Sequence, residues 1–216
     1  MPVPKSNRAR DFDWDVDMHK VITDSLHGLT ETERRGMFRL RYDTFFTRLG
    51  WDVKTTSDGE EIDEYDANDR AMYIVAKASD DGVDACWRLL PTLGPNMLRD
   101  TFPQLLHGMS APAAADVWEL SRFAIATDRL PTSEDAGNPQ IGFGQLSVEL
   151  MRASVLFART NGIARYVTVT TAAIERMLKR QGLNIRRMGP PIRIGEVMTL
   201  ACFIEIDQQT SDALGI

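Results

Sequence analysis

An arginine within an apolar helical stripe is the first residue of this sequence whose position suggests chemistry. Met37, Arg41 and Phe45 are spaced four residues apart, so on a helix they lie on one face. A guanidinium in that stripe either extends to the rim of the core or projects into a pocket, where it pairs with an acid. The spacing leaves both interpretations open.

A run of acidic residues offers possible partners for such an arginine. Residues 58 to 69 contain seven carboxylates and neither Lys nor Arg. Composition alone favours a loop exposed to solvent, whereas a cationic ligand would give this charge a function. We expect Asp58, Glu60 and Glu61 to face solvent under either interpretation.

A further candidate, Glu119, lies in the segment WELSRFAI, which is typical of a buried strand. Burial raises the pKa of a carboxylate, and Glu119 would then suit a general base near neutral pH. Alternatively, Glu119 only anchors an arginine. The alternation of a strand predicts one face with Trp118, Leu120 and Arg122, and an opposite face with Glu119, Ser121 and Phe123.

The elements that must position these residues can be predicted from periodicity and turn residues. Thr30 and Glu33 form a capping box that begins a helix from about 31 to 49, and Gly50 ends it. Strands are predicted at 72–78, 83–90, 117–125, 165–171 and 196–206, helices at 145–160 and 172–180, a hairpin turn at 80–82 and a loop at 131–142.

This order of elements indicates an α+β fold. We expect a single-domain three-layer α/β/α sandwich with a mostly antiparallel, twisted central sheet. Residues 1 to 28 are expected to form an N-terminal arm, either a short strand laid over the core or a poorly ordered segment. Residues 29 to 216 would then form the functional domain.

Composition argues against several classes of protein. The formal net charge of -6 over 216 residues does not favour a nucleic-acid partner or an anionic membrane. Two cysteines and three scattered histidines predict neither a disulfide framework nor a metal site. Because the sequence shows no signal peptide and no membrane span, we expect a cytoplasmic protein without stable membrane association.

Five motifs resemble those of the acyl-homoserine-lactone synthases, the bacterial autoinducer synthases of quorum sensing. They are RLRYDTFFTRLGW, DEYDANDR, CWRLLPT, LRDTFPQLLHG and WELSRFAI, and the resemblance covers roughly residues 25 to 205. It implies an N-acetyltransferase-like fold and an acyltransferase that takes its acyl chain from acyl carrier protein or, in some members, from coenzyme A. The acceptor would be S-adenosylmethionine, a substrate rather than a cofactor, and the products an N-acyl-homoserine lactone, methylthioadenosine and the free thiol carrier.

The resemblance also assigns site residues. Acids suit the sulfonium and ammonium groups of S-adenosylmethionine, an arginine suits its carboxylate, and aromatic rings suit its adenine. The catalytic residues would be Glu119, Glu64 and Arg122; Glu119 is the preferred base, with Glu64 or a bound water as alternatives. The S-adenosylmethionine site would comprise Arg41, Phe45, Trp51, Asp66, Asp69, Arg88, Phe102, Ser121, Arg122 and Phe123.

Two further regions are implied for the acyl donor. Arg176, Lys179 and Arg180 would dock the carrier, although a solvated helix face would have the same composition. A glycine-rich segment at 140–144 resembles the pyrophosphate loop of acetyltransferases. The pocket for the acyl chain would be lined by Trp87, Leu146, Leu150, Met151, Thr168, Val169, Thr170 and Met177. These residue types would also occur in a generic core. By resemblance, a threonine at position 170 favours 3-oxo acyl chains.

Two other functions fit parts of the same sequence. An ordinary coenzyme A-dependent N-acetyltransferase would have this fold but would leave the arginines and acids unused. A catalytically silent protein would bind S-adenosylmethionine without turnover. The acyl chain length, the donor and the oligomeric state are left open by the sequence.

Overall fold

The computed structural model describes residues 19–77, 82–129 and 144–216. In these residues eight strands form one sheet in the order β1-β2-β3-β4-β5-β8-β6, with β7 also paired to β8. All neighbouring strands are antiparallel except β4 and β5, which are parallel. The strands are β1 Lys20–Ser25, β2 Met72–Lys77, β3 Val83–Pro91, β4 Val117–Ile125, β5 Arg165–Thr171, β6 Ile185–Arg187, β7 Ile192–Ile194 and β8 Val197–Glu205.

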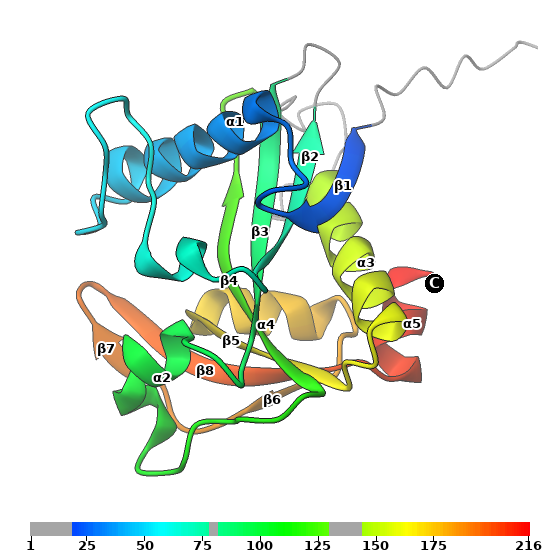
Figure 1. Ribbon diagram of the computed structural model, residues 1–216. Coiled ribbons are helices and arrows are strands. Elements are labelled where there is room, and N and C mark those ends of the chain that lie inside the picture. The colour runs from blue at the N-terminus through cyan, green and yellow to red at the C-terminus, as the bar shows by residue number, and fades with distance from the viewer. Residues whose placement is uncertain (1–18, 78–81, 130–143) are drawn as a thin grey trace, which may run out of the picture.

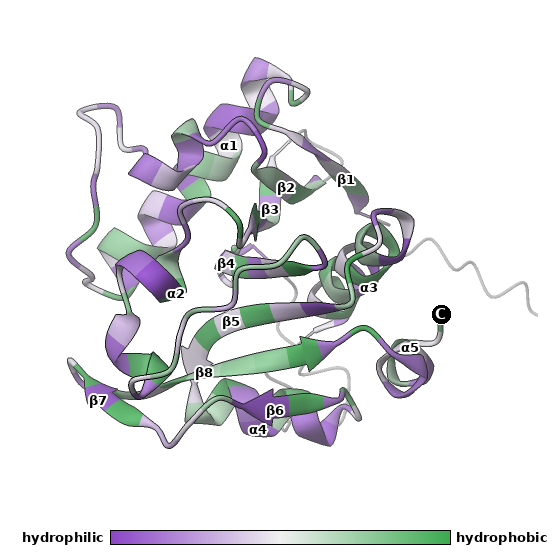
Figure 2. Ribbon diagram, turned by 60° about the horizontal axis from the view of Figure 1, so that its bottom comes forward, coloured by the Kyte–Doolittle hydropathy of each residue, from purple (hydrophilic) through white to green (hydrophobic). Residues whose placement is uncertain are grey.

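Helices cover both faces of this sheet (Figure 1). One face packs against α3, α4 and α5 in a single apolar cluster, and the other packs against α1, α2 and η3 in two smaller clusters. Strand β8, in the middle of the second half of the sheet, is hydrophobic along most of its length (Figure 2). The helices are α1 Glu31–Arg41, η1 Tyr42–Arg48, η2 Glu64–Ala67, α2 Met97–Asp100, η3 Pro103–Leu106, α3 Gln145–Thr160, α4 Ala172–Arg180 and α5 Gln208–Leu214.

The predicted fold class and most predicted elements are confirmed. Thr30 and Glu33 form the expected capping box, in which each side chain accepts the other's backbone N–H. The predicted helix from 31 to 49 is α-helical only as far as Arg41 and continues as the π-helical η1. Such wide turns are frequent at functional sites, and this one begins directly after Arg41.

Some expectations concern segments only partly described. Strand β1 lies within the expected N-terminal arm and pairs with β2, while residues 1–18 lie outside the described residues. The division of the chain at residue 28 therefore stays a prediction. Most of the predicted turn at 80–82, the loop at 131–142 and residues 140–143 of the glycine-rich segment are also outside the described ranges; Gly144 is the exposed N-cap of α3.

The predicted alternation of strand β4 is wrong beyond Ser121, because the strand contains a bulge. The register with β3 shifts between Cys86 and Arg88, and Arg122 has a φ of 56°. The extra residue turns the side chain of Arg122 to the face of Glu119 and that of Phe123 to the opposite face. There the Phe123 ring packs edge-on against Trp87, with ring centroids 5.0 Å apart.

The parallel strands β4 and β5 pair over only part of their length. Their register runs from Val117 with Arg165 to Leu120 with Thr168, although β4 continues to Ile125 and β5 to Thr171. At the last pair, the Thr168 hydroxyl donates a hydrogen bond to the Leu120 carbonyl, 2.9 Å away. The sheet therefore divides next to Glu119 and Arg122.

A membrane span is not found among the described helices, since each is too short or too polar to cross a bilayer.

Candidate active site

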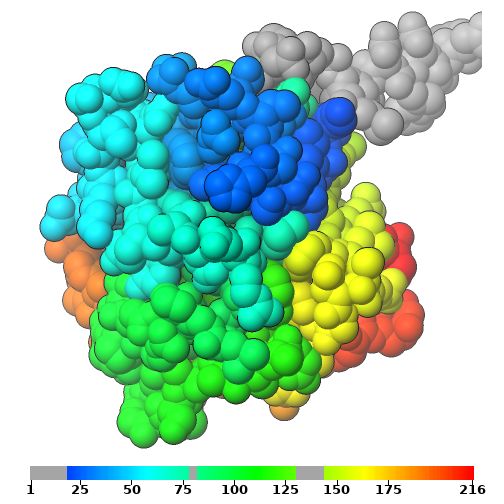
Figure 3. Space-filling view, viewed as in Figure 1, coloured from blue at the N-terminus to red at the C-terminus, as the bar shows by residue number. Residues whose placement is uncertain are grey.

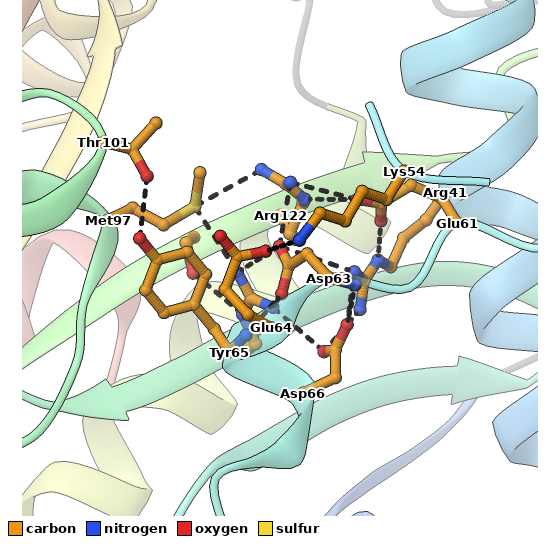
Figure 4. A network of polar contacts seen from close by, with 12 residues as sticks. Arg41, Lys54, Glu61, Asp63, Glu64, Tyr65, Asp66, Met97, Thr101 and Arg122 are labelled. Atoms are coloured by element: carbon orange, nitrogen blue, oxygen red, sulfur yellow. Dashed lines mark hydrogen bonds and ion pairs between the residues drawn. The ribbon is translucent and has the colours of Figure 1, made fainter. Parts of the chain in front are cut away.

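Three arginines and three carboxylates form one network, which is buried except at Arg122, where the side chain is 10% exposed (Figure 4). The arginines come from α1, β3 and β4, and the acids come from the segment that leads into η2 and from η2 itself. Because the numbers of opposite charges are equal, each buried guanidinium can be compensated inside the protein. The members are Arg41, Arg88, Arg122, Glu61, Asp63 and Asp66.

Asp66 lies at the centre of this network. Both Nη atoms of Arg41 donate to its two oxygens at 2.9 and 2.8 Å, and Arg88 Nη1 and the Tyr73 hydroxyl each donate to Oδ1 at 2.9 Å. Burial alone would raise the pKa of Asp66, but Arg41 and Arg88 outweigh it and hold that pKa well below its ordinary value. Asp66 is therefore a permanent carboxylate and not a proton acceptor.

Glu61 and Asp63 complete the network. Glu61, expected to face solvent, is instead fully buried: it accepts from Arg41 Nε at 2.5 Å and from Arg122 Nε at 3.0 Å. Asp63 accepts two hydrogen bonds from Arg88 and pairs with Arg122 Nη2 at 2.8 Å. From the sequence, one can expect that several acids pair with the three arginines. The sequence does not indicate which of the seven acids between residues 58 and 69 form these pairs.

Two predicted acids of the same run lie outside the network. Asp69 is exposed. Glu64 is 58% exposed and pairs with Lys54, whose Nζ lies 2.9 Å from Glu64 Oε2. The hydrogen bond from Lys54 lowers the pKa of Glu64, which makes it a weaker base than an isolated glutamate.

Aromatic rings border the network on the side of η1. The rings of Phe45 and Trp51 are stacked with centroids 5.2 Å apart, and the Arg122 guanidinium lies 5.4 Å from the Phe45 centroid. Phe45 is buried, whereas Trp51 is 46% exposed and offers ring surface to a ligand. Of the other predicted residues, Ser121 accepts from Arg88 Nε at 3.2 Å, and Phe102 is partly buried at the start of η3.

Glu119 is buried on β4 and contacts main chain rather than an arginine. Its two oxygens accept the backbone N–H groups of Met97 and Leu98 at 2.9 and 2.7 Å. Burial raises the pKa of Glu119 to about 6, although these two donors and the nearby arginines act in the opposite direction. The thioether of Met97 accepts from Arg88 and Arg122 at 3.4 and 3.3 Å, so Met97 connects Glu119 to the network.

The predicted acyl-chain residues divide between the two faces of the sheet. Val169 packs into the cluster beneath η3, on the face opposite the others, so it does not lie beside them. A cavity of about 10 Å³ lies between the sheet and helices α3 and α4, enough for one water but not for an acyl chain. The apolar cluster that encloses this cavity contains Trp87, Leu146, Leu150, Met151 and Met177. Thr168 and Thr170 point to the same face of the sheet, where their cross-strand neighbours on β8 are Cys202 and Leu200.

The predicted docking residues are exposed on α4, but they are not equivalent. Lys179 Nζ lies 2.6 Å from Glu175 Oε1, and Arg187 Nη2 lies 2.8 Å from Glu175 Oε2. Arg187 and Lys179 together lower the pKa of Glu175 to about 2, so this acid stays charged and neutralises part of the basic surface. Within the part of the chain that the structure describes, Arg176 and Arg180 form no ion pair.

No group of three or more His, Cys, Asp or Glu side chains in the described ranges is arranged to hold a metal ion.

Comparison with known proteins identifies the family. The family model described as autoinducer synthase matches residues 25–214. An acyl-homoserine-lactone synthase of Pseudomonas aeruginosa is 42% identical over 179 residues, which cover 82% of this chain and 85% of that protein. One of Aliivibrio fischeri is 41% identical over 162 residues, which cover 75% and 79%.

Solved structures agree with this comparison. The acyl-homoserine-lactone synthase LasI superposes with a TM-score of 0.80 at 37% identity, covering 92% of this chain and 95% of its own. An acyl-CoA N-acyltransferase of Pseudomonas aeruginosa, 14% identical with a TM-score of 0.57, shares the fold. This chain belongs to the acyl-homoserine-lactone synthase family of autoinducer synthases, which are acyltransferases.

Proposed function

We propose that this enzyme transfers an acyl group from a carrier thioester to the α-amine of S-adenosylmethionine and then closes the lactone, releasing methylthioadenosine. One observation carries the proposal: the charge-balanced arginine network lies beside a buried glutamate with a pKa of about 6. Two similar proteins support the choice of ligands. The coenzyme A-dependent synthase BjaI (27% identical, TM-score 0.76) was solved with S-adenosylmethionine and isopentyl-CoA, and TofI (31%, 0.74) with an inhibitor and methylthioadenosine.

In the proposed complex, the exposed ring surface of Trp51 stacks on adenine, with Phe45 behind it and Phe102 as a second apolar wall. Arg122 binds the substrate carboxylate, since its side chain is 10% exposed whereas those of Arg41 and Arg88 are 1% exposed. Arg41, Arg88 and the buried acids hold Arg122 in place. They are positioning residues.

Amide formation needs a neutral amine. The α-ammonium of the substrate, with an ordinary pKa of about 7.7 to 8.0, gives its proton to the Glu119 carboxylate, directly or through one water. The amine then attacks the thioester carbonyl carbon and the C–S bond breaks. The carrier leaves as a thiolate and takes up the second proton of the nitrogen, which gives the amide and the free thiol. The backbone donors on Glu119 occupy one lone pair of each oxygen and leave others for this proton.

Lactone closure needs orientation more than a base. The substrate carboxylate attacks the carbon that bears the sulfonium, the C–S bond breaks, and methylthioadenosine leaves as a neutral molecule. Correct placement of the carboxylate by Arg122 is equivalent to an effective concentration of about 10⁵ M or more. The proposed reaction requires no cofactor, and we expect it in the cytoplasm.

The phosphopantetheine arm of the acyl donor would bind where β4 and β5 separate. Beyond Leu120 and Thr168 the strands separate, so their backbone groups can bind the amides of a phosphopantetheine arm, which acyl carrier protein and coenzyme A share. The acyl chain would enter beside Thr168 and Thr170. Because the core there is closed, side chains such as Met151 must move when the chain binds.

Replacing Thr170 by valine is expected to lower the preference for 3-oxo donors by about 5- to 10-fold. The Thr170 hydroxyl can donate a hydrogen bond to a 3-oxo oxygen, and valine keeps the shape of the side chain without the hydroxyl. The measurement is kcat/KM for 3-oxo and unsubstituted donors of equal chain length. An unchanged ratio would show that Thr170 does not read the 3-position.

We infer that acyl carrier protein is the physiological donor, because Arg176 and Arg180 are exposed on α4 without an ion pair to any described residue, and this positive charge suits a strongly acidic carrier. Reversing both charges with Glu is expected to raise KM for the acyl carrier protein donor about 10-fold and to leave KM for S-adenosylmethionine unchanged. Arg39→Glu, on α1 across the sheet, is the control. Equal increases for both substrates would contradict docking on α4.

The donor itself is tested by comparing initial rates with one acyl chain on acyl carrier protein and on coenzyme A. We expect kcat/KM to be at least about 10-fold higher for the carrier protein. A higher value for coenzyme A would overturn this part of the proposal.

A further inference from the structure

An exposed ion pair lies on the solvent side of the arginine network and is not used in the reaction steps proposed above. Lys54 Nζ is 2.9 Å from Glu64 Oε2, and the two side chains are 69% and 58% exposed. Figure 4 shows the pair in front of Asp63 and Arg122. Figure 3 shows that the segment between η1 and β2, which carries both residues, forms the molecular surface between α1 and the region of α2 and η3.

The backbone fixes the two residues although their side chains are exposed. The Lys54 carbonyl accepts the N–H of Ile62 at 3.3 Å, and the next residue, Thr55, forms a β-bridge with buried Glu61. Glu64 directly follows Asp63, whose carboxylate caps η2 and also binds Arg88 and Arg122. Both side chains therefore start from backbone anchored to the network.

The charges of Lys54 and Glu64 interact with the part of the network formed by Asp63 and Arg122. Lys54 is the main cause of the lowered pKa of Glu64, and Arg122 contributes in the same direction. The electrostatic field at Lys54 includes Asp63 as well as Glu64. An ionic group that binds at Arg122 will thus interact with both members of the pair.

The buried network alone cannot satisfy an amino-acid group. Its acids are already engaged by arginines, and Arg122 is its most exposed cation. An α-amino acid carries an ammonium and a carboxylate on one carbon, so it presents the same two charges as the Lys54–Glu64 pair. Because an exposed ion pair contributes little free energy, it opens readily for such a ligand.

We propose that Lys54 and Glu64 are further binding residues for the amino-acid part of S-adenosylmethionine. The pair opens, Lys54 joins Arg122 on the substrate carboxylate, and Glu64 binds the α-ammonium. Glu64 holds this ammonium and Glu119 takes its proton, so the two carboxylates divide the roles of binding and catalysis. This inference rests on the proposed function.

The test compares two ligands that differ in the amino-acid part. Lys54→Met and Glu64→Gln are each expected to weaken binding of S-adenosylmethionine about 10-fold, measured by isothermal titration calorimetry. Binding of methylthioadenosine, which lacks both charged groups, should change less than about 2-fold. These effects correspond to the contribution of one charge-assisted hydrogen bond.

Arg35→Met is the control, because it removes another ion pair of the same acidic run, in which the Arg35 side chain is 41% exposed and that of Glu60 12% exposed. It should change neither affinity. Unchanged S-adenosylmethionine binding in both variants, or equal weakening of both ligands, would overturn the inference while lactone formation still supported the proposed function. A wild-type protein that binds neither ligand and forms no lactone would overturn both.

Discussion

Replacing Asp66 by asparagine is expected to lower the free energy of unfolding by about 3–5 kcal/mol. Asparagine keeps the shape of the side chain but removes the charge that compensates Arg41 and Arg88, both buried. It also turns an NH₂ group toward a guanidinium. The measurement is urea unfolding followed by circular dichroism, and lactone formation should fall with the loss of Arg122 positioning.

Asp69→Asn is the control, because Asp69 is an exposed acid three residues away. It should change the free energy of unfolding by less than about 0.5 kcal/mol. A loss below about 1 kcal/mol for Asp66→Asn would contradict a charge-balanced network held together by Asp66.

The same carboxylate predicts how stability depends on pH. The folded-state pKa of Asp66 is depressed below its ordinary value of 3.8, so its contribution is fully present above that value. It is lost as pH falls through 3.8 toward the lower folded-state pKa. The wild type should therefore lose stability steeply below about pH 4, and Asp66→Asn should lose it less steeply.

Replacing Glu119 by glutamine is expected to lower kcat by about 10²–10⁴-fold, the usual contribution of a general base. Glutamine cannot take the ammonium proton. For the wild type, kcat/KM should rise with pH through an apparent pKa near 6, because only the carboxylate form of Glu119 accepts a proton. The variant should lack this limb of the pH profile.

Folding of the Glu119 variant needs its own measurement, since the glutamine NH₂ group would face the N–H of Met97 or Leu98. Circular dichroism and binding of methylthioadenosine serve this purpose. A folded variant that retains more than half of the wild-type turnover would exclude Glu119 as the base.

Local sequence patterns predict the regular elements of this protein well. The ranges of α3 and α4 agree with the helices expected from apolar periodicity and from the glycines that follow them. The π-helical turn after Arg41 has no such signal, because its apolar spacing fits an α-helix equally well. The bulge at Arg122 was missed because a positive φ at an arginine depends on pairing with β3, not on local preference.

In the candidate site, too, residues on regular elements could be predicted from the sequence, whereas residues whose position depends on tertiary structure could not. The arginines and Glu119 lie on regular elements whose burial can be expected from pattern. The acids lie in a segment with little periodicity, where any of seven carboxylates could pair with the arginines. The bridge between Thr55 and Glu61 and the capping of η2 by Asp63 decide which acids are buried, and both depend on tertiary structure.

The proposed function requires that this network and Glu119 convert S-adenosylmethionine into a lactone. The most direct measurement is mass spectrometry of purified protein incubated with S-adenosylmethionine and acyl donors on carrier protein and coenzyme A. We predict N-acyl-homoserine lactone and methylthioadenosine in a one-to-one ratio. An acylated amine without methylthioadenosine would indicate an ordinary N-acetyltransferase, and bound S-adenosylmethionine without any product would indicate a silent binding protein; either result would contradict the proposed function.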